Sequence, residues 1–356
     1  MYIAFYISSH GFGHMTRCIS IIQNLLNNSE YKVYVVCDKK QNDFCRIYLS
    51  RFSDRIIYKD IVTDVGFVNK RNSLEVDIIA LKRNLEQFKL SLDYVIKVEC
   101  EFLKTIDVKC VVSDISIIGC IVGKILCLPN IFASNFSWVE QYEHIGIDDS
   151  IINKFREAYS CVNKLIKYDL CLDMNSIDAD ENYDLGFVCR DIDEHRVSYI
   201  KLEYGSSIFI TCGKSANLSC INVRNFEGTI FTTSGIEISC NVGCRVVELP
   251  VDVLDTQNYI AASEIVIAKA GWGTIAESIL GHVGLVLVER PSAREDTFNI
   301  EKIKERKLGI SIKESDLTNI DVDKIKEKLK NNIHYEKLKT YENDAEKVAD
   351  LILNHL

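Results

Sequence analysis

Apolar residues in the first half of the chain alternate between two spacings. Tyr2 to Ile7 is apolar throughout, which is typical of a central strand in a parallel sheet covered on both faces. Residues 15–26 follow with the spacing of an amphipathic helix. The same reasoning predicts strands at 32–37, 55–58, 109–113 and 130–133, and helices over 73–105 and 116–126. This alternation indicates an α/β domain with a parallel sheet.

A second alternation begins after a helical segment at 150–166. We expect strands at 168–172, 207–211, 229–232, 245–249, 264–268 and 285–288, with helices near 193–203, 255–262, 274–280 and 295–307. The chain is therefore predicted to be α/β with two Rossmann-like, doubly wound domains, residues 1–165 and 166–334. The tail, residues 335–356, has a helical apolar stripe that could pack against either domain, such as back on the N-terminal one.

Composition narrows the class of protein. The 356 residues are 47% hydrophobic and 26% charged, and a net charge of −9 argues against a nucleic-acid partner. The apolar N-terminus is too short for a signal peptide, and Lys124 interrupts the longest apolar region, so membrane association should be peripheral at most. Fourteen cysteines without a C-x-x-C pair are typical of a reducing compartment. We expect a cytoplasmic protein.

A glycine-rich turn joins one of the expected strands to a helix in the second half. The turn reads Gly271-Trp272-Gly273-Thr274, and its glycines would let the backbone approach a ligand while the first helical N–H groups point at negative charge. Glu277, three residues later, could accept hydrogen bonds from the two hydroxyls of a ribose. The pattern predicts a nucleotide site, and the alternative is a tight turn followed by a solvated glutamate.

The first strand-to-helix turn, residues 10–17, also contains glycines. Gly11 and Gly13 fit the start of a dinucleotide-binding G-x-G-x-x-G motif, but Thr16 replaces its third glycine. The substitution argues against a nicotinamide or flavin site.

Two polar side chains are expected at the same edge of the first sheet. His14 opens a helix, where the cationic form of an imidazole is disfavoured, so it could act as a base. Asp114 ends a strand and could orient it, so that the pair removes a proton from an acceptor hydroxyl. Alternatively, His14 caps its helix and Asp114 caps the next one. His10 has a similar position, and Arg17 could bind phosphate or pair with a carboxylate.

Four stretches in this order resemble a known family: Phe5 to Ile7 leading into His10-Gly11-Phe12-Gly13-His14-x-x-Arg17; Ser113-Asp114; Asn135-Phe136-Ser137-Trp138; and Lys269-x-Gly271-x-Gly273-Thr274-x-x-Glu277. Together they are similar to the two-domain nucleotide-sugar glycosyltransferases of GT-B fold. The resemblance is greatest to the glycosyltransferase-like N-terminal region of plant L-arabinokinases and its bacterial relatives. It extends more distantly to the N-acetylglucosaminyltransferase that forms lipid II.

The resemblance implies roles for individual residues. His14 would be the base and Asp114 its orienter, and Glu277 would bind the donor ribose. The donor diphosphate would lie against the second-half turn, with Trp272 shaping the pocket. A loop containing Gly213 and Ser215, which has one glycine where the relative has two, and the acidic pair Glu295 and Asp296 would complete the donor side.

Acceptor-side residues are implied for the first domain. They are His10, Gly13, Arg17, Asn135 and Trp138. Phe136 and Trp138 could stack on an acceptor sugar or a nucleobase, or could instead be core anchors.

The resemblance implies transfer of a sugar from a nucleotide sugar, most simply a UDP-sugar, to a hydroxyl acceptor such as a lipid- or glycan-linked one. Helix-start N–H groups would stabilise the leaving diphosphate, without a metal or other cofactor. The chain has no H-E-x-x-H or clustered Cys/His spacing that would suggest a metal site. Two alternatives remain: a nucleotide-sugar hydrolase or 2-epimerase on the same fold, and a protein that binds a nucleotide sugar without catalysis.

Overall fold

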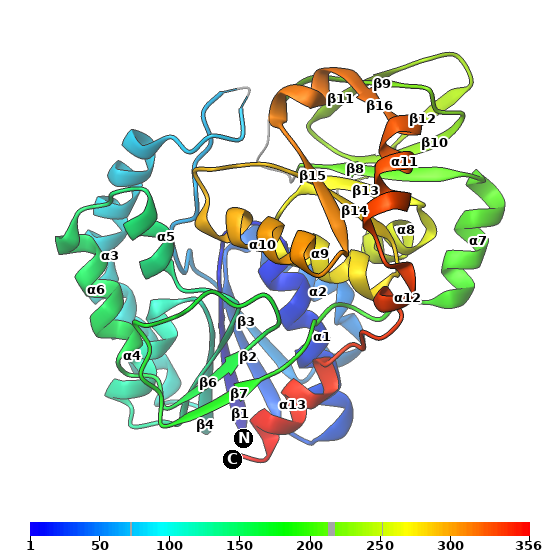
Figure 1. Ribbon diagram of the computed structural model, residues 1–356. Coiled ribbons are helices and arrows are strands. Elements are labelled where there is room, and N and C mark those ends of the chain that lie inside the picture. The colour runs from blue at the N-terminus through cyan, green and yellow to red at the C-terminus, as the bar shows by residue number, and fades with distance from the viewer. Residues whose placement is uncertain (72, 213–217, 251) are drawn as a thin grey trace. The chain divides into compact units, whose positions relative to one another are not determined.

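The computed structural model (Figure 1) describes residues 1–71, 73–212, 218–250 and 252–356. It divides into two compact units. Unit 1 comprises residues 1–68, 77–188 and 344–356, and unit 2 comprises residues 69–76 and 189–343.

Unit 1 is a parallel sheet covered by helices on both faces. Its strands are β1 (Tyr2–Ile7), β2 (Lys32–Cys37), β3 (Ile56–Asp60), β4 (Val108–Asp114), β5 (Asn130–Ser134), β6 (Lys164–Lys167) and β7 (Glu181–Asp184). Its helices are α1 (Gly13–Asn28), α2 (Lys39–Tyr48), α3 (Ile78–Leu103), α4 (Ile117–Ile125), α5 (Trp138–His144), α6 (Asp149–Tyr159) and α13 (Ala345–Leu353), with a 3-10 turn at Ser50–Phe52. The seven strands are ordered β3-β2-β1-β4-β5-β6-β7.

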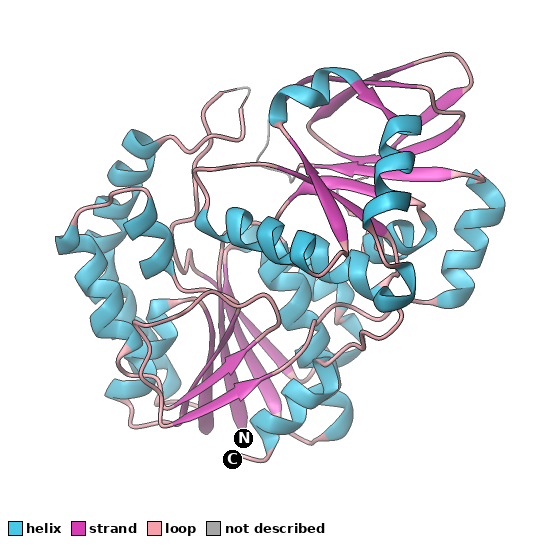
Figure 2. Cartoon of the chain, in the orientation of Figure 1, coloured by secondary structure: helices cyan, strands magenta, loops and turns pink. Residues whose placement is uncertain are grey.

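The helices of unit 1 form two layers. In Figure 2, α3, α4 and α6 lie on one side of this sheet and α1, α2 and α13 on the other. The continuous apolar run of β1 follows from this double cover, since Ile3 to Ile7 are at most 1% exposed. The C-terminal helix α13 buries Ala345, Val348, Ala349 and Ile352 and packs against α1. The sequence left open which domain the C-terminal tail packs against, and in the structure α13 packs against unit 1.

The first sheet extends further along the chain than the pattern of residues predicts. The expected strand at 168–172 does not form, and Leu170 leaves the extended conformation with φ 58°. The strands are instead β6 and β7, which continue the sheet by pairing Ile131 with Lys164 and Lys164 with Glu181. Unit 1 therefore runs to Val188, beyond the boundary expected at residue 165.

Unit 2 has a second parallel sheet and a small additional one. Its strands are β8 (Ser207–Thr211), β9 (Leu218–Arg224), β10 (Gly228–Thr233), β11 (Ile236–Cys240), β12 (Cys244–Leu249), β13 (Ile265–Lys269), β14 (Gly284–Val288), β15 (Gly309–Ile312) and β16 (Ile320–Asp321). Its helices are α7 (Glu194–Tyr204), α8 (Thr256–Ala262), α9 (Trp272–Leu280), α10 (Arg294–Glu305), α11 (Val322–Asn332) and α12 (Tyr335–Leu338), with a 3-10 helix at Glu314–Asn319. The sheets are ordered β12-β10-β8-β13-β14-β15 and β11-β9-β16.

The predicted fold class, α/β with two Rossmann-like units, is confirmed. In unit 2, the strands that the sequence did not predict are β9, β11, β15 and β16. Strand β11 alternates buried or partly buried positions with exposed ones, and β16 is only two residues long, so neither forms a continuous apolar run.

Candidate functional site

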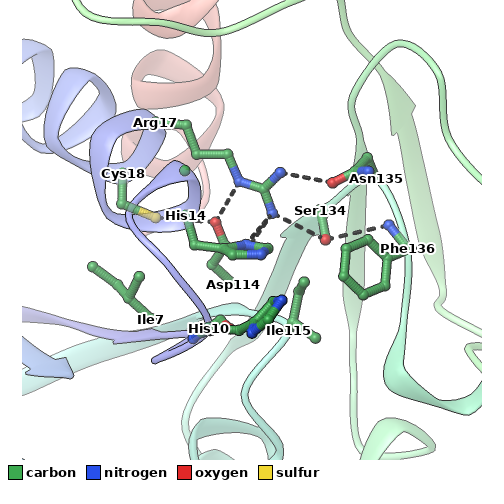
Figure 3. A network of polar contacts seen from close by, with 12 residues as sticks. Ile7, His10, His14, Arg17, Cys18, Asp114, Ile115, Ser134, Asn135 and Phe136 are labelled. Atoms are coloured by element: carbon green, nitrogen blue, oxygen red, sulfur yellow. Dashed lines mark hydrogen bonds and ion pairs between the residues drawn. The ribbon is translucent and has the colours of Figure 1, made fainter. Parts of the chain in front are cut away.

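The carboxyl ends of β1 and β4 bring together residues that are a hundred positions apart. These strands pair in parallel with Ile7 opposite Asp114, and the Ser8 amide donates to the Asp114 carbonyl at 3.0 Å. Helix α1 then begins at Gly13. His14 Nδ1 consequently lies 2.9 Å from Asp114 Oδ1, and both side chains are buried (Figure 3). The structure thus makes the pair that the sequence predicted from shared strand ends.

Arg17 pairs with the same carboxylate through two nitrogens. Its Nε donates to Asp114 Oδ2 at 2.6 Å and its Nη2 to Oδ1 at 2.5 Å. The remaining nitrogen, Nη1, donates to Asn135 Oδ1 at 2.7 Å, and the guanidinium lies over the Tyr168 ring at 5.0 Å. Figure 3 shows the guanidinium between His14, Asp114 and Asn135. Of the two roles considered for Arg17, the geometry is that of carboxylate pairing.

Because Asp114 is ionised, the ring nitrogen of His14 that carries the proton can be identified. Burial alone would raise the pKa of the Asp114 carboxyl, but Arg17 and then His14 lower that pKa well below its usual range. An ionised carboxylate only accepts hydrogen bonds, so Nδ1 carries a proton and donates it to Oδ1. Arg17 Nη2, also 2.9 Å from Nδ1, directs its own donation to Asp114. The lone pair of His14 is then on Nε2, the atom that could act as a base.

The backbone immediately after Asp114 is strained. Ile115 has φ 66°, a left-handed conformation that a β-branched residue rarely adopts. The Tyr159 hydroxyl donates to the Ile115 carbonyl at 2.8 Å and helps to hold it there. Strain of this kind concentrates at functional sites, and here it lies next to the carboxylate that holds His14.

His10 and Trp138 form a neighbouring aromatic cluster. Their ring centroids are 5.6 Å apart, and Trp138 stacks on Tyr142 at 5.2 Å. A Cβ on Gly66 would lie 1.7 Å from His10 Nδ1, so a glycine is required for the loop to pack against this ring. Trp138 is 1% exposed, which is the geometry of a core anchor rather than of a surface on which a sugar stacks.

A second buried carboxylate, Asp64, was missed at the sequence level. The Ser9 amide donates to its Oδ1 at 2.9 Å and Trp138 Nε1 to its Oδ2 at 2.8 Å. Burial raises the pKa of Asp64. The residue belongs to no recognisable motif, and only the fold places it beside the turn that carries His14.

Asp64 also borders a cavity of about 410 Å³ within unit 1. The cavity lies between the loop after β3 and the side of α3. Its other lining residues are Val62, Val65, Gly66, Asn84, Gln87, Phe88 and Ser91.

In unit 2, the glycine-rich turn leads directly into α9 as predicted. Gly271 precedes the helix, which has no side-chain cap at this end. Asn299 Nδ2 donates to the Ala270 carbonyl at 2.9 Å and fixes the turn. A Cβ at Gly271 would lie 3.5 Å from Lys269 Cε, so the side chain of Lys269 passes beside the helix start. Burial and then Arg290 lower the pKa of Lys269.

Glu277 is held by a buried arginine that the sequence analysis did not identify. Arg190 Nη2 lies 2.7 Å from Glu277 Oε1 and 2.9 Å from Thr256 Oγ1, and Nη1 donates to the Leu254 carbonyl. Glu277 is 7% exposed, so it is not a solvated surface residue. Among the described residues, none hydrogen-bonds to its other oxygen, Oε2.

The remaining donor-side residues differ in their surroundings. Trp272 is buried, at 3% exposure. Asp296 is fully buried and accepts from Arg290 Nη2 at 2.9 Å, whereas Glu295 is partly exposed in the first turn of α10. Gly213 and Ser215 lie outside the described residues.

Three further observations concern thiols, metal ligands and membrane-spanning helices. All fourteen cysteines are free thiols. In the described part of the chain, no three His, Cys, Asp or Glu side chains gather as metal ligands would. None of the helices described is both long enough and apolar enough to cross a membrane.

Comparison with known proteins identifies a matching protein family and a similar curated protein. Residues 239–354 match the family described as Glycosyltransferase family 28 C-terminal domain. The chain is 25% identical over 333 residues to L-arabinokinase of Arabidopsis thaliana. The matched region covers 88% of this chain but only 30% of that protein. The chain therefore spans less than a third of this curated relative.

Solved structures with 12% sequence identity share the fold over nearly the whole chain. Arabidopsis thaliana UGT89C1 complexed with UDP superposes with a TM-score of 0.68 and covers 99% of this chain and 98% of its own. The glycosyltransferase SnogD from Streptomyces nogalater superposes with a TM-score of 0.64 and covers 100% of both chains. The resemblance noted in the sequence is confirmed: residues 239–354 match a glycosyltransferase family, and the chain shares the two-domain fold of solved glycosyltransferases over nearly its whole length.

Proposed function

We propose that the chain transfers a sugar from a UDP-sugar to a hydroxyl acceptor, with His14 as general base. The observation that carries the proposal is the 2.9 Å contact between His14 Nδ1 and Asp114 Oδ1, which leaves the Nε2 lone pair for the acceptor. Nε2 would take the hydroxyl proton as the acceptor oxygen bonds to the anomeric carbon. The bond from that carbon to the diphosphate would break, and UDP would leave with the electron pair.

The donor would bind to unit 2. Its diphosphate would lie at the start of α9, where backbone N–H groups and the Lys269 amine meet negative charge without a metal ion or other cofactor. Its ribose would hydrogen-bond to Glu277 Oε2. The fold neighbours support this assignment, since UGT89C1 is complexed with UDP-L-rhamnose in one structure and Phytolacca americana UGT2 with UDP-2fluoro-glucose and pterostilbene in another.

The acceptor would bind to unit 1, where Asn84, Gln87 and Ser91 give the 410 Å³ cavity a polar wall suited to hydroxyl groups. Hydroxyl acceptors of all three kinds, namely small molecules, lipid-linked and glycan-linked ones, belong in the assay. Fourteen free thiols agree with the reducing cytoplasm as the place of reaction.

The proposal is tested by incubating the purified chain with a panel of sugar nucleotides, with and without hydroxyl acceptors. We expect UDP release that depends on acceptor and is lost in His14→Ala. His195→Ala, which changes an exposed histidine on α7, is the matched control and should retain activity. Free sugar without acceptor would identify a hydrolase, and an epimerised sugar a 2-epimerase. Tight binding without turnover would identify a binding protein.

Replacing Glu277 with Gln is expected to weaken UDP binding about tenfold or more, since a hydrogen bond to a charged acceptor contributes roughly 1.5–3 kcal/mol. Gln retains an oxygen that can accept from Arg190 Nη2, so this contact can be kept in the variant. Isothermal titration calorimetry with UDP and with 2′-deoxy-UDP separates loss of the hydrogen bond to the ribose 2′-hydroxyl from a general weakening of nucleotide binding. The native chain should prefer UDP, and the variant should lose most of that preference.

Glu327→Gln, at an exposed position on α11, is the control and should bind both nucleotides as the native chain does. An undiminished preference for UDP in Glu277→Gln would show that the ribose binds elsewhere.

A further inference from the structure

The charges buried around His14 do not balance with Asp114 alone. Asp114 accepts from two nitrogens of Arg17, at 2.6 and 2.5 Å, so its negative charge is already matched by a guanidinium. A proton gained by His14 would leave two cations facing one anion, in a site where Arg17 and Asp114 are each 2% exposed. An uncompensated charge is costly at this burial. Another anion would be needed to stabilise the protonated imidazole.

Asp64 supplies such an anion from the other side of β1. The Thr63 hydroxyl donates to the Ile7 carbonyl, and the Ser9 amide donates to Asp64 Oδ1 at 2.9 Å. The end of β1 therefore lies between Asp114, its register partner on β4, and Asp64 on the loop after β3. Helix α1, which carries His14 in its first turn, follows this strand end after a short loop.

The groups bonded to Asp64 favour its charged form. Ser9 N–H and Trp138 Nε1–H are both donors, and they bind different carboxylate oxygens. Although burial raises the pKa of Asp64, the Ser8 and Trp138 side chains and the charge of a protonated His14 lower it. Trp138 also connects the two residues through packing, because its ring lies 5.4 Å from Phe136 and Phe136 lies 6.0 Å from the His14 ring.

The titratable and charged groups near His14 and its partner Arg17 come from several elements at this edge of the sheet. They are Arg17 and Cys18 on α1, Asp114 on β4, His10 on the turn before α1, Asp64 on the loop after β3 and Tyr168 after β6. Of these, Cys18 is a thiol that donates to Asp114 Oδ2 at 3.2 Å, and burial raises its pKa and that of Tyr168. Asp64 is therefore the one group among them that carries a negative charge not already matched by Arg17.

We infer that Asp64 is a positioning residue that stabilises the protonated form of His14 and holds the turn carrying it. With His14 neutral, one guanidinium faces two carboxylates, and the proton taken from the acceptor restores the balance. Asp64 thereby makes His14 a stronger base. The catalytic meaning of this role depends on the proposed transferase reaction, but the charge coupling is a property of the folded chain and is measurable without substrate.

The test is a titration of the His14 ring followed by NMR in the native chain and in Asp64→Asn. An acidic neighbour favours the protonated imidazole, so removing its charge should move the transition of the His14 ring signals to lower pH. Asp64→Glu, which keeps the charge, should restore most of the native value. In assays of an active chain, the acidic limb of the kcat/KM profile should move to lower pH in Asp64→Asn by the same amount.

Glu99→Gln is the matched control. Glu99 is a fully buried carboxylate of unit 1 that accepts from the Tyr6 hydroxyl at 2.9 Å and the Tyr34 hydroxyl at 3.0 Å. Its loss should perturb stability but leave the titration of His14 unchanged. An unchanged His14 titration in Asp64→Asn would overturn the inference.

If Asp64→Asn does not fold, the native chain still decides the question. The carboxyl carbon signal of Asp64 should shift as His14 titrates, and a signal that does not respond would overturn the inference equally. Because neither titration requires turnover, coupling without sugar transfer would refute only the proposed function, and transfer without coupling would refute only the role of Asp64.

Discussion

Replacement of His14 with Ala is expected to lower kcat by about 10²–10⁴-fold, the usual contribution of a positioned general base. The imidazole is the group whose Nε2 is available once Nδ1 donates to Asp114 at 2.9 Å. Its loss leaves the acceptor hydroxyl without a base, while the donor site in unit 2 remains intact. Acceptor-dependent UDP release at saturating substrates measures kcat, and calorimetry with UDP should give an unchanged affinity.

A general base also gives the defect a particular pH dependence. The native rate should fall as His14 is protonated, and the residual rate of His14→Ala should lack that limb. The exposed-residue variant His195→Ala should reproduce the native profile. A His14→Ala rate within threefold of native would show that another group takes the proton.

The pairing of His14 with Asp114 could be predicted because it depends only on topology. A βα turn and the end of another parallel strand share one edge of a sheet, whatever the details of packing. The same reasoning predicted that the start of α9, which carries Glu277, follows the carboxyl end of a strand in the second sheet. Where two roles remained open, as for Arg17, the decision required distances that no spacing of residues provides.

Asp64 and Arg190 could not be predicted, since their partners come from other parts of the chain. Asp64 binds Ser9 and Trp138, which are 55 and 74 positions away, and Arg190 binds Glu277 across 87. Neither residue stands in a glycine-rich or otherwise distinctive segment. Strand β6 was missed for a related reason, because the more apolar stretch after it turns at Leu170 instead of extending.

Replacement of Arg17 with Met is expected to lower the free energy of unfolding of unit 1 by about 3–5 kcal/mol, because it leaves the Asp114 carboxylate buried without a cation. The chain has two tryptophans, Trp138 in unit 1 and Trp272 in unit 2. In a Trp272→Phe background, urea unfolding followed by fluorescence therefore reports unit 1 alone. Arg46→Met, which breaks a surface pair whose arginine is 37% exposed, should cost at most about 1 kcal/mol.

Two measurements separate the contribution of the Arg17 charge to stability from that of its packing: the pH dependence of the stability difference, and a double variant. Arg17 and His14 depress the pKa of folded Asp114 despite its burial, so its contribution is fully present above the unfolded value of about 3.9 and is lost only as pH falls through the lower folded value. The difference between native and Arg17→Met should therefore be largest near neutral pH and should shrink in acid, where the variant's unpaired carboxyl takes up a proton. Arg17→Met combined with Asp114→Leu should recover much of the loss at pH 7, since no charge is then buried. A double variant as unstable as Arg17→Met would show that packing of the guanidinium against Tyr168 and Asn135, rather than its charge, holds this edge of the sheet together.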